Sequence, residues 1–285
     1  MKRAAAVAKW AARTLAIVLL VIVGATVLIR FAPGYLSDAR EMDSRYSDSV
    51  RAQLSAEAVR SSSLKHLLSV ELSGWLRGDG GISRQYGVPV SELIVPRLAV
   101  TGALLLRALA LAWLLALCAS LLSSTARKPS TLWQAPAALL LAVPTAAMAT
   151  LCLIAGYGGP VLVMALLLAA RDFKFLHHTL REAWLDPHLL QARAQGVRTH
   201  RMVLGYILPS LAPQLSALAS LSLVTALSAL VPVEVIFNVP GLGELAWNAA
   251  LNRDLPVLLS TTIIMALAVT LTGLASNRPS EWRSA

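Results

Sequence analysis

The sequence contains too few charged residues for a soluble domain of its length. Charged residues make up only 14% of the 285 residues, whereas hydrophobic residues make up 56%, and the mean hydropathy is +0.65. A soluble domain must cover its surface with polar side chains, so this composition predicts an integral membrane protein. Aromatic residues reach only 6%, and the alternating pattern of a membrane β-barrel is missing, so we expect tightly packed α-helices.

Several groups that would carry chemistry are also missing. There is no Gly-x-x-x-x-Gly-Lys-Ser/Thr segment, whose backbone and lysine would hold nucleotide phosphates, and no Gly-x-Ser-x-Gly segment. Cys118 and Cys152 both lie in apolar stretches and are interpreted as small buried side chains. Four histidines of one polar stretch have no Cys or carboxylate at a familiar ligand spacing (His177, His178, His188 and His200). We therefore predict no metal, no cofactor and no enzymatic activity.

Six apolar segments can cross a bilayer at a rise of 1.5 Å per residue, although the fourth is only marginally long. They are predicted at residues 10–31, 98–122, 132–155, 161–176, 202–231 and 255–274. No convincing small-residue cleavage site follows the first segment, which favours an uncleaved helix over a signal peptide. Pro136 and Pro144 predict kinks in the third segment. Arg107 lies inside the second, where it either faces a cavity or partner or reaches an interface along its apolar stem.

These segments divide the chain into four parts. Residues 1–31 form a cytoplasmic amino terminus and the first helix, 32–97 a large polar external region, 98–274 a domain of five membrane helices, and 275–285 a short tail. The proposed inner side holds 14 basic and four acidic residues, and the outer side holds 9 basic and 11 acidic residues. This positive-inside bias places both termini in the cytoplasm and explains the net charge of +10 without nucleic acid.

A polar loop at residues 177–201 separates the fourth and fifth spans, and a short helix is predicted within it at residues 187–195. Asp186 can serve as the N-cap, Pro187 suits the first helical position, and Gly196 is a typical C-terminal stop. The apolar residues of this helix can share one face and the polar residues another, which suits a helix that offers a ridge to a partner. The ridge comprises Leu189, Leu190 and Ala192, opposite Gln191 and Arg193.

The residues around Gly196 carry a family resemblance. The segment Ala192-Arg193-Ala194-Gln195-Gly196, with Leu208-Pro209 following at the right spacing, resembles the cytoplasmic loop of permease subunits in binding-protein-dependent ABC importers. The fuller match is to the dipeptide, oligopeptide and nickel branch. Leu190 and Gln191 stand in the places of the motif's Glu and first Ala, and Tyr206 in that of its Ile. In that family the short helix docks into a cleft on a separate ATPase subunit. The resemblance implies ATPase-coupling roles for Asp186, Pro187, Leu189, Leu190, Ala192, Arg193, Ala194 and Gly196.

Three outer stretches resemble the same family. One is Arg30-Phe31-Ala32-Pro33-Gly34, at the end of the first helix, and another is Gly78-Asp79-Gly80-Gly81-Ile82-Ser83. The third reads Glu-x-x-Phe-x-x-Pro-Gly-Leu-Gly from Glu234, followed by Asn-Arg-Asp-x-Pro up to Pro256. Its proline and glycines predict a sharp reversal of the chain near the translocation path. The residues assigned to this external loop are Glu234, Phe237, Pro240, Gly241, Gly243, Arg253 and Asp254.

The resemblance implies an all-α permease subunit with six transmembrane helices, in the bacterial plasma (inner) membrane. It also implies a second homologous permease subunit, ABC ATPase subunits and an external substrate-binding protein as partners. Peptides are the favoured cargo, and nickel or metal chelates are the alternative. Two other classes compete. An ion-coupled secondary transporter would need intramembrane acidic residues or inverted repeats, and we expect neither; a membrane enzyme or scaffold would need a polar constellation within the spans.

Overall fold

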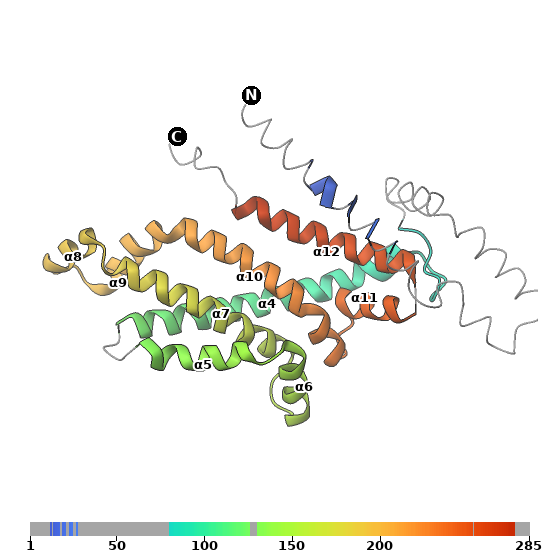
Figure 1. Cartoon of the computed structure of the whole chain (residues 1–285), viewed down its shortest axis with the longest axis horizontal. Coiled ribbons are helices and arrows are strands. Elements are labelled where there is room, and N and C mark those ends of the chain that lie inside the picture. Colours follow the sequence, from blue (N-terminus) through green and yellow to red (C-terminus); the bar gives the residue numbers. More distant parts are fainter. Residues whose placement is uncertain are drawn as a thin grey trace, which may run out of the picture. The chain divides into compact units, whose positions relative to one another are not determined.

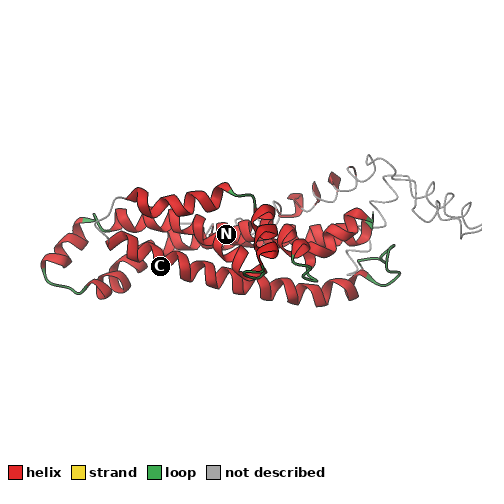
Figure 2. Ribbon diagram, turned by 90° about the horizontal axis from the view of Figure 1, so that it is seen from below, coloured by secondary structure: helices red, strands yellow, loops and turns green. Residues whose placement is uncertain are grey.

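The computed structural model describes residues 80–125, 130–252 and 254–276, with scattered positions between residues 12 and 27. The first predicted span, most of the external region, Arg253 and most of the tail therefore lie outside the described residues. Figure 2 shows that the described segments are helices joined by loops, and one isolated bridge joins Ile82 and Pro89. The prediction of an all-α protein is confirmed over this part of the chain.

Ten helical segments follow one another along the described chain (Figure 1). They are α4 (Val90–Thr125), α5 (Ser130–Ala142), α6 (Thr145–Ala155), α7 (Pro160–Ala183), α8 (Pro187–Ala194), α9 (Thr199–Met202), the π-helix η1 (Val203–Ile207), α10 (Leu208–Ile236), α11 (Leu242–Leu251) and α12 (Leu255–Ser276).

Three of these helical stretches are long and apolar enough to cross a membrane, namely Val90–Ser123, Val203–Ile236 and Leu255–Thr272. They correspond to the second, fifth and sixth predicted spans. The bent pair α5 and α6, at the third predicted span, would make a fourth. The helix at the fourth predicted span, α7, does not meet the same criteria. The structure thus supports an integral membrane protein, and six spans remain a prediction.

The third predicted span is broken at Pro144. Helix α5 ends at Ala142, α6 begins at Thr145, and the two axes are bent by 95°. Pro144 has no N–H to donate to the preceding turn, and its ring would clash with the carbonyl four residues earlier, so the helix ends before it. The predicted kink at Pro144 is confirmed. Helix α5 continues across Pro136, which lies inside it.

The described chain forms two compact units, each with its own internal contacts. Among the residues described from position 80 onward, one unit comprises 80–99 and 245–268, and the other comprises 100–244 and 269–276. In the second unit, α7 packs against α5, α6 and α10. Figure 1 shows α8 and α9 at one end of α7 and α10, so these two long helices flank the short loop helices.

Candidate functional site

The short helix α8 begins at the predicted residue and ends one residue before the predicted end. It runs from Pro187 to Ala194, one residue shorter than expected, and the Leu189 N–H donates to the Asp186 carbonyl at 3.0 Å. Gly196 has φ of +78°, and the Val197 N–H donates to the Ala192 carbonyl at 3.2 Å. These two features define a Schellman C-cap, in which a left-handed residue ends the helix. Glycine adopts this conformation without the steric cost of a Cβ, which explains why Gly196 stands here.

The apolar face of α8 is turned toward the chain's own core. Leu189 and Ala192 are buried in a hydrophobic cluster, the coupling cluster, whose other buried members come from α7, α9, η1 and α10. These members are Leu180, Met202, Ile207 and Leu211. The sequence placed Leu189 and Ala192 on a ridge offered to a partner, whereas the structure uses them to attach α8 to the helices that flank it.

The opposite side of the loop is exposed. Its exposed residues are Asp186, Pro187, Gln191, Ala194 and Gly196. The side chains of Leu190 and Arg193 lie outside the described residues. A coupling role for any of these residues stays a prediction.

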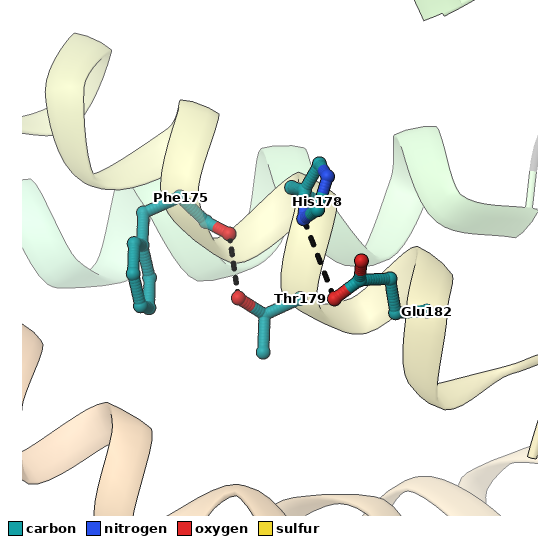
Figure 3. Close-up of polar contacts among 4 residues, drawn as sticks. All are labelled: Phe175, His178, Thr179 and Glu182. Carbon is teal, nitrogen blue, oxygen red and sulfur yellow. Dashed lines mark hydrogen bonds and ion pairs between the residues drawn. The ribbon is translucent and has the colours of Figure 1, made fainter.

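Two histidines at the end of α7 lie in different surroundings. His178 is exposed and its Nδ1 lies 3.4 Å from Oε2 of Glu182, one turn later (Figure 3). His177 is buried, and its Nδ1 lies 2.7 Å from the Ser123 hydroxyl of α4. The side chains of His188 and His200 are outside the described part. Among the side chains that are described, no three His, Cys, Asp or Glu residues gather as a metal site would require.

The two cysteines are less buried than the sequence predicts. Cys118 is exposed on α4, and Cys152 is half-buried on α6, and both thiols are free. The prediction that both are buried is therefore wrong. A membrane helix is apolar on its outer face as well as its inner one, so an apolar stretch does not decide which way a side chain points.

The loop between α10 and α11, predicted to be external, is organised by one buried carboxyl group, that of Glu234. Oε2 of Glu234 accepts hydrogen bonds from the N–H groups of Gly243 at 2.7 Å and Glu244 at 3.2 Å. Its Oε1 accepts the hydroxyl of Thr101 in α4 at 2.7 Å, and this hydroxyl accepts the N–H of Leu242 at 2.8 Å. The first N–H groups of a helix have no partner within the helix and carry its positive dipole end. Glu234 and Thr101 together therefore cap the amino terminus of α11.

The two glycines of this loop stand where a side chain has no room. A Cβ on Gly241 would overlap the carboxyl group of Glu234, and a Cβ on Gly243 would lie 2.9 Å from the Val231 Cα. Both glycines are buried. Only a residue without a side chain leaves room for the carboxyl group beneath the first turn of α11, so the spacing of Glu234, Gly241 and Gly243 has a steric cause.

A tight turn follows α10 at the position where the sequence predicts a reversal of the chain. Phe237 follows the last residue of α10 and is half-buried, and its N–H donates to the Val233 carbonyl at 3.1 Å. Asn238 then adopts a φ of +51°, a left-handed conformation that asparagine tolerates better than most residues. Pro240 is exposed at the tip of the reversal.

A second buried carboxyl group joins two of the predicted motifs. Oδ2 of Asp254, which precedes α12, accepts the Ser83 hydroxyl and, at 3.1 Å, the N–H of Gln85. The Ser83 hydroxyl also accepts the Tyr86 N–H at 3.0 Å, and the backbones of Ser83 and Val88 are bonded at 2.9 Å. Asp254 therefore anchors the tight loop that leads into α4. The structure thus joins Ser83, the last residue of the Gly-Asp-x-Gly-x-Ser motif, to Asp254 of the Asn-Arg-Asp-x-Pro motif.

Comparison with known proteins identifies the family. A model of the binding-protein-dependent transport system inner membrane component matches residues 103–278, which is more than half of the chain. The chain belongs to this family. The predicted family is thus confirmed, and it is a family of transport components rather than of enzymes.

Three relatives of this transport component are informative. The putative peptide permease protein of Brucella ovis is 25% identical over 282 residues, covering 85% of this chain and 86% of that protein. The oligopeptide transport system permease protein OppB of Escherichia coli K12 is 31% identical over 107 residues, covering 37% and 35%. The metal-staphylopine import system permease protein CntB of Staphylococcus aureus is 29% identical over 108 residues, covering 38% and 34%.

The structure corrects the prediction about acidic residues in the spans. It also shows hydroxyl groups that the sequence analysis did not identify. The sequence predicts no acidic residues within the spans, yet Glu234 is buried near the end of the candidate span Val203–Ile236. Asp172 is also buried, within α7, which is not one of the candidate spans. Thr101, Ser123 and Ser222 bond buried polar groups from other helices. A hydroxyl in an apolar helix gives no sequence signal for its distant partner, so these contacts could not be predicted.

Proposed function

We propose that the chain is the permease subunit of an ATP-driven importer that carries peptides or related small solutes across the bacterial inner membrane. The observation that carries this proposal is the family match over residues 103–278, which includes the capped helix α8. Relatives named as peptide and oligopeptide permeases support peptide cargo, and the relative named for metal-staphylopine import supports a metal chelate as the alternative.

ATP hydrolysis would take place on separate ATPase subunits that contact α8 from the cytoplasm. Leu189 and Ala192 tie α8 to α7 and to the start of α10 through the coupling cluster. Because packed interiors are close to incompressible, a displacement of α8 is passed to both long helices. This arrangement supports alternating access, in which movement of the ATPases reorients the membrane helices and opens the path first outward and then inward.

The external loop would lie near the outer mouth of the translocation path. Glu234 and Thr101 hold the amino terminus of α11 against α4 and α10, so the loop has a defined position rather than an adjustable one. A preorganised outer surface suits a permease that receives cargo from an external substrate-binding protein. A second, homologous permease subunit would form the other half of the path, and both termini would lie in the cytoplasm.

The test is uptake by the purified complex. The tagged chain is purified from its own host in mild detergent, its co-purifying proteins are identified by mass spectrometry, and the complex is reconstituted in liposomes with radiolabelled peptides and the accompanying binding protein. We expect a second permease, ATPase subunits and peptide uptake that requires ATP. Uptake that persists without ATP but follows an ion gradient would contradict the proposal in favour of a secondary transporter. Uptake of a metal chelate but not of peptides would support the alternative cargo.

A further inference from the structure

Helix α7 carries a buried acid, Asp172, that has no role in the proposed coupling mechanism. Asp172 is completely buried, and its two carboxyl oxygens lie 2.8 and 2.7 Å from the hydroxyl oxygen of Ser222 on α10. Ser222 is also completely buried, and its hydroxyl lies 2.9 Å from the Leu218 carbonyl of its own helix. The contact joins two helices at positions 50 residues apart in the chain.

A buried carboxyl group is costly in a membrane protein and is retained at positions where it has a function. Apolar contacts give little directional preference between helices in a membrane, because lipid tails are as apolar as leucine side chains. A hydrogen bond between side chains of two helices is directional, and it fixes how far one helix slides along the other. The Asp172–Ser222 contact therefore sets the register of α7 against α10.

The position of this contact matters because α7 and α10 are the long helices that precede and follow the α8 region along the chain. The coupling cluster already joins their ends next to α8, through Leu180 on α7 and Leu211 on α10. Asp172 lies two turns before Leu180, so the polar contact joins the same two helices at a second level. One point of attachment prevents sliding but still lets the two helices hinge about it, whereas two separate points prevent both.

We propose that Asp172 is a positioning residue that, with Ser222, holds α7 and α10 in one register so that both helices move as a single body when α8 is displaced. This inference rests on the proposed ATP-driven function. It adds that the unit driven by the ATPases is the whole α7–α10 pair rather than α8 alone.

The exposed face of α7 provides a matched comparison. There the Thr179 hydroxyl donates to the Phe175 carbonyl at 2.9 Å, and His178 lies beside Glu182, so these contacts stay within one helix (Figure 3). Removing the Thr179 hydroxyl deletes a hydrogen bond of similar length without separating α7 from α10. Thr179→Val is therefore the control for any substitution of Asp172.

The geometry also indicates which substitution of Asp172 should keep the hydrogen bond between the two helices. The single hydroxyl proton of Ser222 cannot serve both Asp172 and the Leu218 carbonyl fully. An asparagine at position 172 can donate its amide N–H to the Ser222 oxygen and leave the hydroxyl free for Leu218. Asp172→Asn should thus preserve the inter-helix contact, and Asp172→Leu should remove it while still filling the space between the helices.

The first measurement is the amount of peptide taken up per ATP hydrolysed by the reconstituted complex. Asp172→Leu should lower this ratio at least about fivefold, with ATP hydrolysis continuing, because a coupling free energy of the usual size is lost. Asp172→Asn and Thr179→Val should retain the ratio. An unchanged ratio in Asp172→Leu would overturn the proposal, as would an equal loss in Thr179→Val.

The second measurement replaces the hydrogen bond by a covalent one. Asp172→Cys and Ser222→Cys are combined in a chain whose own Cys118 and Cys152 are changed to alanine, and a short thiol cross-linker is added. The reduced pair should be poorly coupled, and cross-linking should restore the ratio, because the helices do not move relative to each other during transport. Cross-linking that abolishes ATP-driven uptake, with recovery after the linker is cleaved, would overturn the proposal. Failure of the proposed function is recognised separately, since the unsubstituted complex would then show no ATP-driven uptake.

Discussion

Replacing Gly241 by alanine should break the cap of α11 by displacing the carboxyl group of Glu234. The added Cβ occupies the position of the Glu234 carboxyl group, so that group must leave its place beneath the helix. Its departure removes the acceptor of three hydrogen bonds, from the hydroxyl of Thr101 and the N–H groups of Gly243 and Glu244. Gly241→Ala should therefore resemble Glu234→Ala, although the two residues are not neighbours in the sequence.

The magnitude follows from the number of donors that lose their acceptor. A buried donor without an acceptor costs about 1–3 kcal/mol, so three give about 3–9 kcal/mol by simple addition. Partial rearrangement lowers such sums, so we expect each single variant to lose about 3 kcal/mol, at the lower end of this range. In the Glu234→Ala background, the Cβ that Gly241→Ala introduces enters space that the carboxyl group has vacated. Adding Gly241→Ala in that background should therefore cost less than about 1 kcal/mol.

The assay is thermal denaturation of the detergent-purified complex, followed as loss of the monodisperse peak in size-exclusion chromatography. Both single variants should denature at clearly lower temperature, and the double variant should match Glu234→Ala. Gly102→Ala is the control, because this glycine follows Thr101 in α4 and its added Cβ would meet no neighbour within 4 Å; it should not destabilise the chain. Equal costs of Gly241→Ala in both backgrounds would refute the steric argument.

Three further outcomes are expected. Gly196→Phe should uncouple ATP hydrolysis from uptake. Gly196→Asn should keep the coupling, because asparagine tolerates the left-handed backbone of this position. A Cβ at position 196 would meet nothing within 4 Å in this chain, so an equal loss of coupling in both variants would show that backbone strain, and not a clash with a partner, is responsible. Ser83→Ala should lower thermal stability by about 1–3 kcal/mol. In the Asp254→Ala background it should cost less, because only the contact with the Tyr86 N–H is then left to lose, and additive losses would contradict a shared contact. Ser123→Ala leaves Nδ1 of the buried His177 without its partner and should cost about 1–3 kcal/mol, to be measured by the same thermal assay.

The parts of the fold that depend on local chemistry were predictable from the sequence. The start of α8 at Pro187, its end before Gly196 and the break at Pro144 all follow from backbone preferences of single residues. The apolar segments at 98–122 and 255–274 predicted α4 and α12, because length and hydropathy alone decide membrane insertion. Such features need no knowledge of the rest of the chain.

The orientation of α8 was less predictable. Its alternation of apolar and polar residues indicated two faces, but the pattern does not say which surface covers the apolar one. Leu189 and Ala192 could face a partner or their own chain, and the structure has them in one cluster with Leu180 and Met202. Arg107 is similar. It is exposed on α4, and the sequence pattern alone does not distinguish an arginine that faces a partner from one that reaches an interface.

The loop between α10 and α11 was predictable only in part. Glu234, Gly241 and Gly243 stand in one motif, and their fixed spacing signals that something constrains them together. The carboxyl group of Glu234 needs hydrogen-bond donors, and the two glycines leave room for it. Both requirements are met by residues close to one another in the sequence. Thr101 completes the same cap from 133 positions away, and a threonine in an apolar helix is equally compatible with a bond to its own backbone. A motif therefore reveals the residues that constrain one another at short range, and the hydroxyl that closes the network becomes visible only when the helices are placed side by side.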